Sequence, residues 1–189
     1  MDEPTYLRAL ELSDLDRMHL WHNDKELYEM VGGPFRYTSK HATQAWLERK
    51  TGYAANSPIA DEINLAICIR GENKHIGNIY LHQINWIARN AELRIFIGDP
   101  EERSKGYGRS AIRQLLSYAF NDIGLKRVHL GVLTDNPAAE NSYRKIGFSV
   151  EGTLRNHVFK QGVWKDVLLM GICAEDCISR DVPGSGGDR

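Results

Sequence analysis

The sequence predicts an α+β domain built around one central, mostly antiparallel mixed sheet flanked by helices. Three apolar strand patterns, residues 63–70, 75–84 and 90–99, follow one another with only short connections. Helical patterns come before them, and a helix followed by a strand at 127–134 comes after them. At 189 residues the chain is long enough to bury a full core, and it shows no repeat or linker.

The first fifty residues predict one strand and up to three helices. A weak alternation indicates a strand at 6–10, and Ser13 with Asp14 then gives a helix-start signal. Asn23, with Glu26 three residues later, resembles a capping box and predicts a second, short helix. Residues 39–50 predict a third helix. We expect one of its sides to carry Ala42, Ala45, Trp46 and Arg49.

The rest of the chain alternates strands with helices. The strands at 63–70 and 75–84 should form a hairpin, because only a four-residue polar turn separates them. Asn136 and Gly147 mark the start and end of a helix, and two closing strands follow it. We expect a folded domain at 1–175 and a polar, flexible tail at 176–189. The helix after residue 108 should bury Ala111, Ile112, Leu115, Leu116, Ala119 and Phe120.

Composition excludes several classes of function. Hydrophobic residues make up 42% and charged residues 26% of the chain, and the net charge is −1. Nothing in this balance favours a nucleic acid or a membrane surface as partner. Three cysteines without a CxxC pattern are typical of a reduced, cytoplasmic protein, and no signal peptide is expected. Seven scattered histidines show no recognisable metal spacing, so no metal is expected.

The segment EERSKGYGRSAIRQLL, residues 101–116, carries the first candidate site. Gly106 and Gly108 let a bulky anion approach the backbone N–H groups just where a helix begins. Arg103, Lys105 and Arg109 add positive charge, so the loop suits a pyrophosphate. The pattern is neither the dinucleotide fingerprint nor a Walker loop. A plain glycine turn between strand and helix, or an unrelated nucleotide site, stays an alternative.

A second candidate follows in NPAAENSYRKIGF, residues 136–148. Asn136, Ala139 and Tyr143 fall on neighbouring turns of one helix, so Tyr143 projects from the side of the capped end. A packing role for the ring of Tyr143 is the alternative.

Together the two segments resemble the GCN5-related N-acetyltransferase (GNAT) family. The family's Gln/Arg-x-x-Gly-x-Gly/Ala loop is matched by Arg103, Gly106 and Gly108. The resemblance runs from about Thr5 to Cys173. Within the family it points to the branch of ribosomal-protein N-terminal acetyltransferases and spermidine acetyltransferases. The family's later helix is matched by Asn136, Ala139, Tyr143, Lys145, Gly147 and Phe148.

The resemblance implies acetyl transfer from acetyl-CoA, a co-substrate, to a primary amine. The sheet would be split between the strands at 90–99 and 127–134, and acetyl-CoA would lie in that opening. Tyr143 would protonate the leaving thiolate, and Glu92 would act as the base or orient a water. Pairing with Arg94 is the alternative for Glu92. The implied cofactor-binding residues are Ile95, Phe96, Ile97, Arg103, Ser104, Lys105, Gly106, Tyr107, Gly108, Arg109, Asn136 and Asn141.

The resemblance implies that the early helices help to select the acceptor amine, and that polyamine acetyltransferases carry an acidic cluster near residues 36–50. This segment holds Arg36, Lys40, His41, Arg49 and Lys50 against one acidic residue, Glu48. A polycation would meet like charge there, which favours a peptide N-terminus or a small amine. Spermidine and a catalytically silent CoA sensor stay alternatives, and a homodimer is possible. The aromatic residues Phe35, Tyr37 and Trp46 are expected in the core, with an acceptor pocket or a dimer contact as the alternatives.

Overall fold

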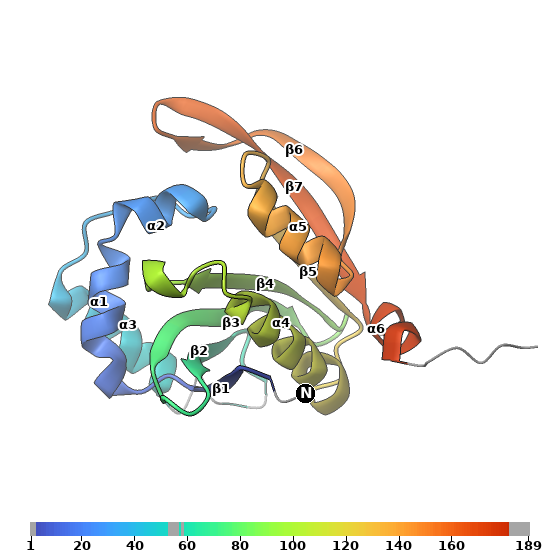
Figure 1. Cartoon of the computed structure of the whole chain (residues 1–189), viewed down its shortest axis with the longest axis horizontal. Coiled ribbons are helices and arrows are strands. Elements are labelled where there is room, and N and C mark those ends of the chain that lie inside the picture. Colours follow the sequence, from blue (N-terminus) through green and yellow to red (C-terminus); the bar gives the residue numbers. More distant parts are fainter. Residues whose placement is uncertain (1–2, 53–56, 58, 182–189) are drawn as a thin grey trace, which may run out of the picture.

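The computed structural model describes residues 3–52, 57 and 59–181 and contains seven strands and six α-helices within them. This element order is the predicted one, with one helix added at the end (Figure 1). In chain order the elements are β1 (Thr5–Ala9), α1 (Leu15–His22), α2 (Lys25–Met30), α3 (Lys40–Thr51), β2 (Ile63–Ile69), β3 (His75–Asn85), β4 (Asn90–Ile97), α4 (Tyr107–Ser117), β5 (Arg127–Leu133), α5 (Pro137–Ile146), β6 (Ser149–Lys160), β7 (Val163–Cys173) and α6 (Ala174–Asp181).

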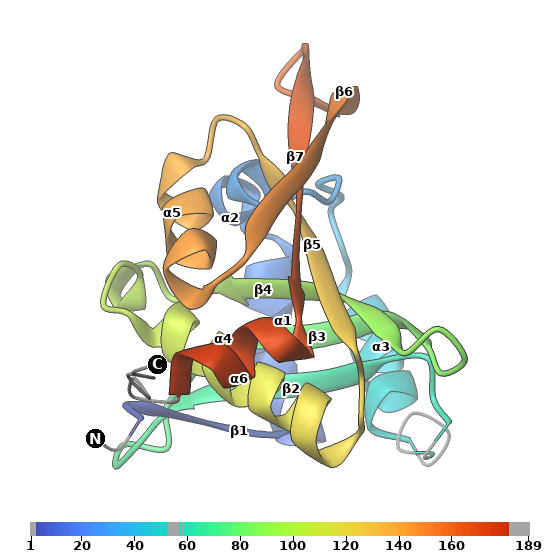
Figure 2. The same ribbon diagram turned by 90° about the vertical axis from the view of Figure 1, so that its right-hand side faces the viewer.

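The strands form one sheet in the order β1-β2-β3-β4-β5-β7-β6. Every neighbouring pair is antiparallel except β4 and β5, which α4 connects as a parallel crossover. The hairpin predicted for β2 and β3 is confirmed. Strands β4 and β5 pair only at Asn90–Arg127, Ala91–Val128 and Glu92–His129, and then they separate. The predicted split of the sheet is therefore confirmed. Figure 2 shows β5, β6 and β7 rising steeply from the layer of β1–β4.

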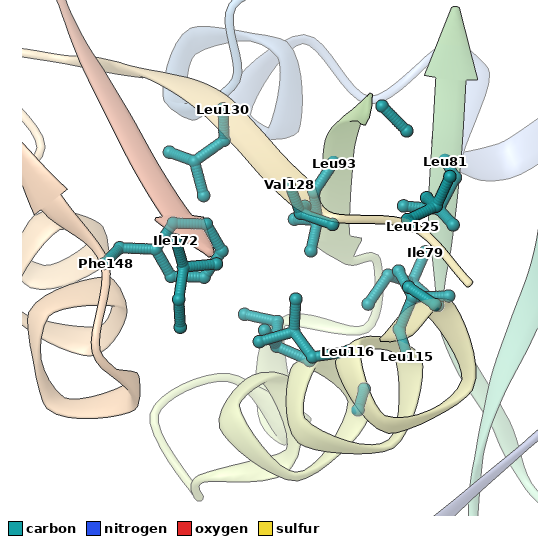
Figure 3. Packing of buried hydrophobic residues seen from close by; sticks show 14 of the residues in the cluster. Ile79, Leu81, Leu93, Leu115, Leu116, Leu125, Val128, Leu130, Phe148 and Ile172 are labelled. Carbon is teal, nitrogen blue, oxygen red and sulfur yellow. The ribbon is translucent and has the colours of Figure 1, made fainter. Parts of the chain in front are cut away.

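The main core lies between the sheet and α4. Leu115 and Leu116 of α4 pack with Leu93 of β4 and Val128 of β5 (Figure 3). Of the six residues predicted to be buried on this helix, five are buried and Phe120 is partly buried. The helix ends at Ser117 and continues as one π turn to Asp122.

Helices α1, α2 and α3 cover the opposite face of the sheet. Alternation along a strand sends successive side chains to opposite faces. In β2, Ile67 packs in the main core, whereas Ala66 and Cys68 pack with Leu47 of α3. In β4, Phe96 packs against the cluster of Met18, Trp21 and Leu27 from α1 and α2.

Several local predictions need correction. Asp24, not Asn23, caps α2, because the Asp24 Oδ1 atom accepts from the Leu27 N–H at 3.0 Å. Asn23 instead connects the end of α1 to the loop that precedes α3. Its side-chain amide donates to the Thr38 carbonyl and accepts from the Thr38 N–H.

The helix predicted at 39–50 is present as α3, but the side with Ala42, Ala45, Trp46 and Arg49 is not its buried side. Thr43 and Leu47 are its buried residues, while Ala42 and Arg49 are exposed. The pattern had too few apolar residues to fix the helix face. Tyr37 is 88% exposed, so its predicted place in the core is wrong.

The end of the chain also differs from the prediction. Helix α6 covers 174–181, so regular structure continues past the predicted boundary at residue 175. Residues 182–189 of the predicted tail lie outside the described residues. None of the helices in the described part of the chain is long and apolar enough to cross a membrane.

Candidate active site

The opening between β4 and β5 is the centre of the candidate site. Beyond Glu92 the edge of β4 that faces β5 has no strand partner, although β4 stays paired with β3 as far as Ile97. Successive residues of a strand direct their backbone groups to alternate edges, so within Ile95–Ile97 only those that face this edge are placed to bind an extended chain. The start of α4 lies on one side of the opening and α5 on the other (Figure 1).

The glycine-rich loop ends in a helix start that no side chain caps. Gly106 is the N-cap of α4 with φ +89°, and no side chain accepts from the first turn. Ser104 also has a positive φ, 63°. The N–H groups of Tyr107, Gly108 and Arg109 belong to the first turn, which lacks intrahelical acceptors. This arrangement fits a pyrophosphate, since such N–H groups and the helix dipole both favour an anion.

Gly106 and Gly108 are needed for different reasons. The positive φ of Gly106 is one that other residues adopt only with strain. Gly108 has no such φ, and a Cβ there would meet only the Ile95 Cδ1 atom, at 3.9 Å. The fold itself therefore does not require glycine at 108. Close approach of a ligand to the backbone does explain it.

We expect Gly108→Val to raise the KM for acetyl-CoA about 10- to 100-fold while the protein stays folded. The branched side chain would stand between the phosphates and N–H groups, and hydrogen bonds to a charged group contribute about 1.5–3 kcal/mol. Steady-state kinetics and a melting curve would measure both quantities. Gly152→Val is the control, because a Cβ at Gly152 meets nothing within 4 Å. An unchanged acetyl-CoA KM would remove the loop from the cofactor site.

Two of the three basic residues in the loop, Arg103 and Lys105, already contact other groups of the protein. The Arg103 guanidinium donates to the carbonyls of Ile97 and Gly98, at 3.0 and 2.8 Å. It also lies 3.6 Å from the Asp24 carboxylate. Lys105 pairs with Glu102 at 2.8 Å. Among the described residues Arg109 has no anionic partner, so it is the side chain of the three that is free to meet a phosphate.

Helix α5 starts as predicted, and the side chain of its N-cap residue, Asn136, makes two hydrogen bonds. The Asn136 Oδ1 atom accepts from the Ala139 N–H at 3.1 Å. The Asn136 Nδ2 atom donates to the Met30 carbonyl of α2 at 3.2 Å. Asn136 therefore joins the start of α5 to the end of α2. Asn141 is exposed on the same helix.

Tyr143 is partly buried on the inner side of α5, where its ring meets Phe148 edge-on at 5.9 Å. Burial raises the pKa of its phenol to about 12. Within the described part of the chain its hydroxyl has no hydrogen-bond partner. The phenol is thus protonated at neutral pH and free to donate.

Glu92 lies at the last paired position before β4 and β5 separate. It points to the face covered by α1–α3, opposite to Leu93. Both of its carboxylate oxygens accept from Arg94, at 3.0 and 2.9 Å. The pairing weighed as the alternative is therefore present, and any role as a base requires this pair to open.

A cavity that the motifs did not indicate lies at the wide end of the opening. Its volume is about 490 Å³. Three of its lining residues are acidic and one, Arg103, is basic. The acidic residues of α2 precede residues 36–50, the segment from which the acceptor was predicted. The cavity is lined by Glu26, Glu29, Met30, Arg103, Leu133, Asp135, Asn136 and Gln161.

Residues 5–149 match the acetyltransferase (GNAT) domain family. The chain belongs to this family. It is accordingly an N-acetyltransferase with acetyl-CoA as co-substrate, as the two motifs implied. Among the described residues no group of three or more histidine, cysteine or acidic side chains is placed to hold a metal.

Known relatives resemble this acetyltransferase over almost its whole length. It is 31% identical to the spermidine N(1)-acetyltransferase of Vibrio cholerae, over 95% of this chain and 99% of that protein. A crystal structure of the Vibrio cholerae spermidine N-acetyltransferase with CoA and spermine superposes with a TM-score of 0.84 and 29% identity, over 94% and 99% of the chains. A dodecameric structure of that enzyme gives a TM-score of 0.79 at 28% identity, over 96% and 100%.

Proposed function

We propose that this enzyme acetylates a primary amine of a cationic acceptor, a polyamine of the spermidine type. The observation that carries the proposal is the charge of the cavity at the wide end of the opening. Glu26, Glu29 and Asp135 line it, and its one basic lining residue, Arg103, directs its guanidinium to two backbone carbonyls. A cationic chain entering this cavity would meet opposite charge. The resemblance to spermidine acetyltransferases supports the same acceptor class.

This proposal reverses the preference drawn from residues 36–50. None of the basic residues of that segment lines the cavity. Lys40 pairs with Asp16 at 2.6 Å, and Lys50 pairs with Glu62. Their charge is therefore no obstacle to a cation at the site. The acidic residues that matter come just earlier, on α2.

The chemistry follows from the positions of the side chains. The neutral amine attacks the thioester carbonyl, a C–N bond forms, and the C–S bond breaks. The backbone N–H groups of β4 beside the opening can stabilise the oxyanion. Tyr143 is proposed to give its proton to the leaving thiolate. Glu92 is proposed to take the amine's proton, directly or through water, after release from Arg94.

Two broader properties are also proposed. Cys68 and Cys173 form no disulfide in the described part of the chain, which supports a reducing, cytoplasmic environment. Self-association is supported by the dodecameric Vibrio cholerae relative and by exposed apolar side chains on the β6–β7 hairpin.

Replacing the cavity carboxylates tests the acceptor proposal. We expect Glu26→Gln and Glu29→Gln each to raise the KM for spermidine about 5-fold, because a partly exposed charge pair contributes up to about 1 kcal/mol. The KM for acetyl-CoA should stay unchanged. Glu72→Gln, in the exposed β2–β3 turn, is the matched control. If both cavity variants matched the control, the carboxylates would have no part in acceptor binding.

A further inference from the structure

The rim of the acidic cavity is closed by polar contacts between segments that are distant in the sequence. Helix α2 carries Glu26 and Glu29, and the turn after β6 contributes Gln161. Figure 1 shows the β6–β7 hairpin reaching over α2. Because α2 has only six residues, its own hydrogen bonds give it little stability, and contacts from elsewhere must fix its position.

Lys160, the last residue of β6, makes the contact between hairpin and helix. Its ammonium donates to the carbonyl of Tyr28 near the end of α2, and to the carbonyl of Gly33 at 2.9 Å. The residue is 9% exposed. No carboxylate of the described residues lies within ion-pair distance of it. Carbonyls at a helix C-terminus carry partial negative charge, so a cation there is stabilised although it is buried.

Other contacts complete the rim. Lys165 of β7 pairs with Asp135 at 2.6 Å, which fixes the hairpin to the segment before α5. Asn136 donates to the Met30 carbonyl, which fixes that segment to α2. Lys160 closes the ring between α2 and the hairpin. Of these contacts, only that of Lys160 is made by a buried charged group, and its loss would leave the Tyr28 and Gly33 carbonyls without this donor.

We propose that Lys160 is a positioning residue for the acceptor: its ammonium holds α2 against the hairpin tip and thereby sets where the Glu26 and Glu29 carboxylates meet the substrate. Lys160 does not itself line the cavity. It acts through the backbone of α2 and the neighbouring Gln161. The inference rests on the proposed function of the cavity as the acceptor site.

The test compares Lys160→Met with Lys126→Met, an exposed lysine at the start of β5. Methionine keeps the length of the side chain but removes the donors. We expect Lys160→Met to lower kcat/KM for spermidine at least about 10-fold, since small misplacements at a site are costly. The KM for acetyl-CoA and the melting-temperature shift caused by acetyl-CoA should match the control. Lys160→Arg should recover part of the activity.

A double variant separates positioning from general damage. If Lys160 acts through the α2 carboxylates, Glu26→Gln should have little further effect in the Lys160→Met background. Full additivity, parental kinetics, or an equal loss of acetyl-CoA binding would overturn the proposal. Failure of the acceptor proposal looks different, because the parent enzyme would then not turn over spermidine. The same variants would in that case be compared on the amine that it does accept.

Discussion

Asp14→Asn is expected to destabilise the protein by about 3–5 kcal/mol, the cost of removing one partner from a buried ion pair. Asp14 is 5% exposed and accepts from Arg8 at 2.7 and 2.8 Å and from the Glu11 N–H at 2.9 Å. The His75 Nδ1 atom lies 3.0 Å from the Asp14 Oδ1 atom. The neutral amide would leave the Arg8 guanidinium, which is 30% exposed, without its anion. Chemical denaturation at pH 7 would measure the loss.

The pH dependence gives this prediction a second readout. Burial by itself would raise the pKa of Asp14, but hydrogen bonds from Arg8, His75 and Glu11 hold that pKa well below its usual range. A lowered pKa in the folded state means that the carboxylate stabilises the protein above the unfolded pKa, about 4. That contribution is lost as the pH falls. The stability gap between parent and variant should therefore narrow in acid.

Asp16→Asn is the matched control, because Asp16 is 81% exposed and pairs with Lys40 on the surface. It should leave the stability nearly unchanged, because an exposed ion pair contributes little. Equal, small effects of both substitutions would show that the buried network contributes little to the fold.

Tyr143→Phe is expected to lower kcat about 10²–10⁴-fold, the usual contribution of general acid catalysis. The change removes the hydroxyl and keeps the ring that meets Phe148, so folding should be retained. Acetyl-CoA binding should change little, because the phenol acts on charge that develops in the transition state. Thiol release at saturating substrates would measure the effect. A pre-steady-state burst would first establish that chemistry limits turnover.

Tyr118→Phe serves as the control for Tyr143, since Tyr118 is 37% exposed after the end of α4. The Tyr143 phenol, with a pKa of about 12, also predicts how kcat depends on pH. The proton donor should stay available throughout the neutral and moderately alkaline range. A kcat within twofold of the parent would leave Tyr143 with only its packing role.

The architecture was predictable because its signals are local and strong. Asn136, Pro137 and Gly147 fix both ends of α5, and the structure confirms each of them. The apolar residues of α4 repeat clearly, and its buried face was therefore found. On α3 the buried residues are Thr43 and Leu47. Because only one of them is apolar, the sequence has no run of apolar residues that would identify the buried face. Helix α6 has no Ser, Thr, Asp or Asn at residue 173 to mark its start; the Asp176 carboxylate in its first turn instead accepts from the Cys173 N–H at 3.0 Å.

The glycine-rich loop and α5 could be located from sequence motifs. The contacts that their side chains make could not be predicted in this way. The contact of Arg103 with the Ile97 and Gly98 carbonyls depends on where β4 ends, which only the folded chain determines. The acidic cavity is lined by α2, by the segment before α5 and by the turn after β6. The last two segments follow α2 by more than a hundred residues. No short sequence window contains it. Residues 36–50, from which the acceptor was predicted, contribute none of its lining residues.

The most direct test of the acceptor proposal compares kcat/KM for spermidine with that for an uncharged primary amine of similar length and for a peptide N-terminus. Measurements at low and raised salt add the charge dependence. The account predicts that spermidine is preferred by about tenfold or more, and that raised salt reduces the preference, because Glu26 and Glu29 line the cavity and Asp135, the third carboxylate, is already paired with Lys165. An equal or better rate with the uncharged amine or the peptide, insensitive to salt, would contradict it.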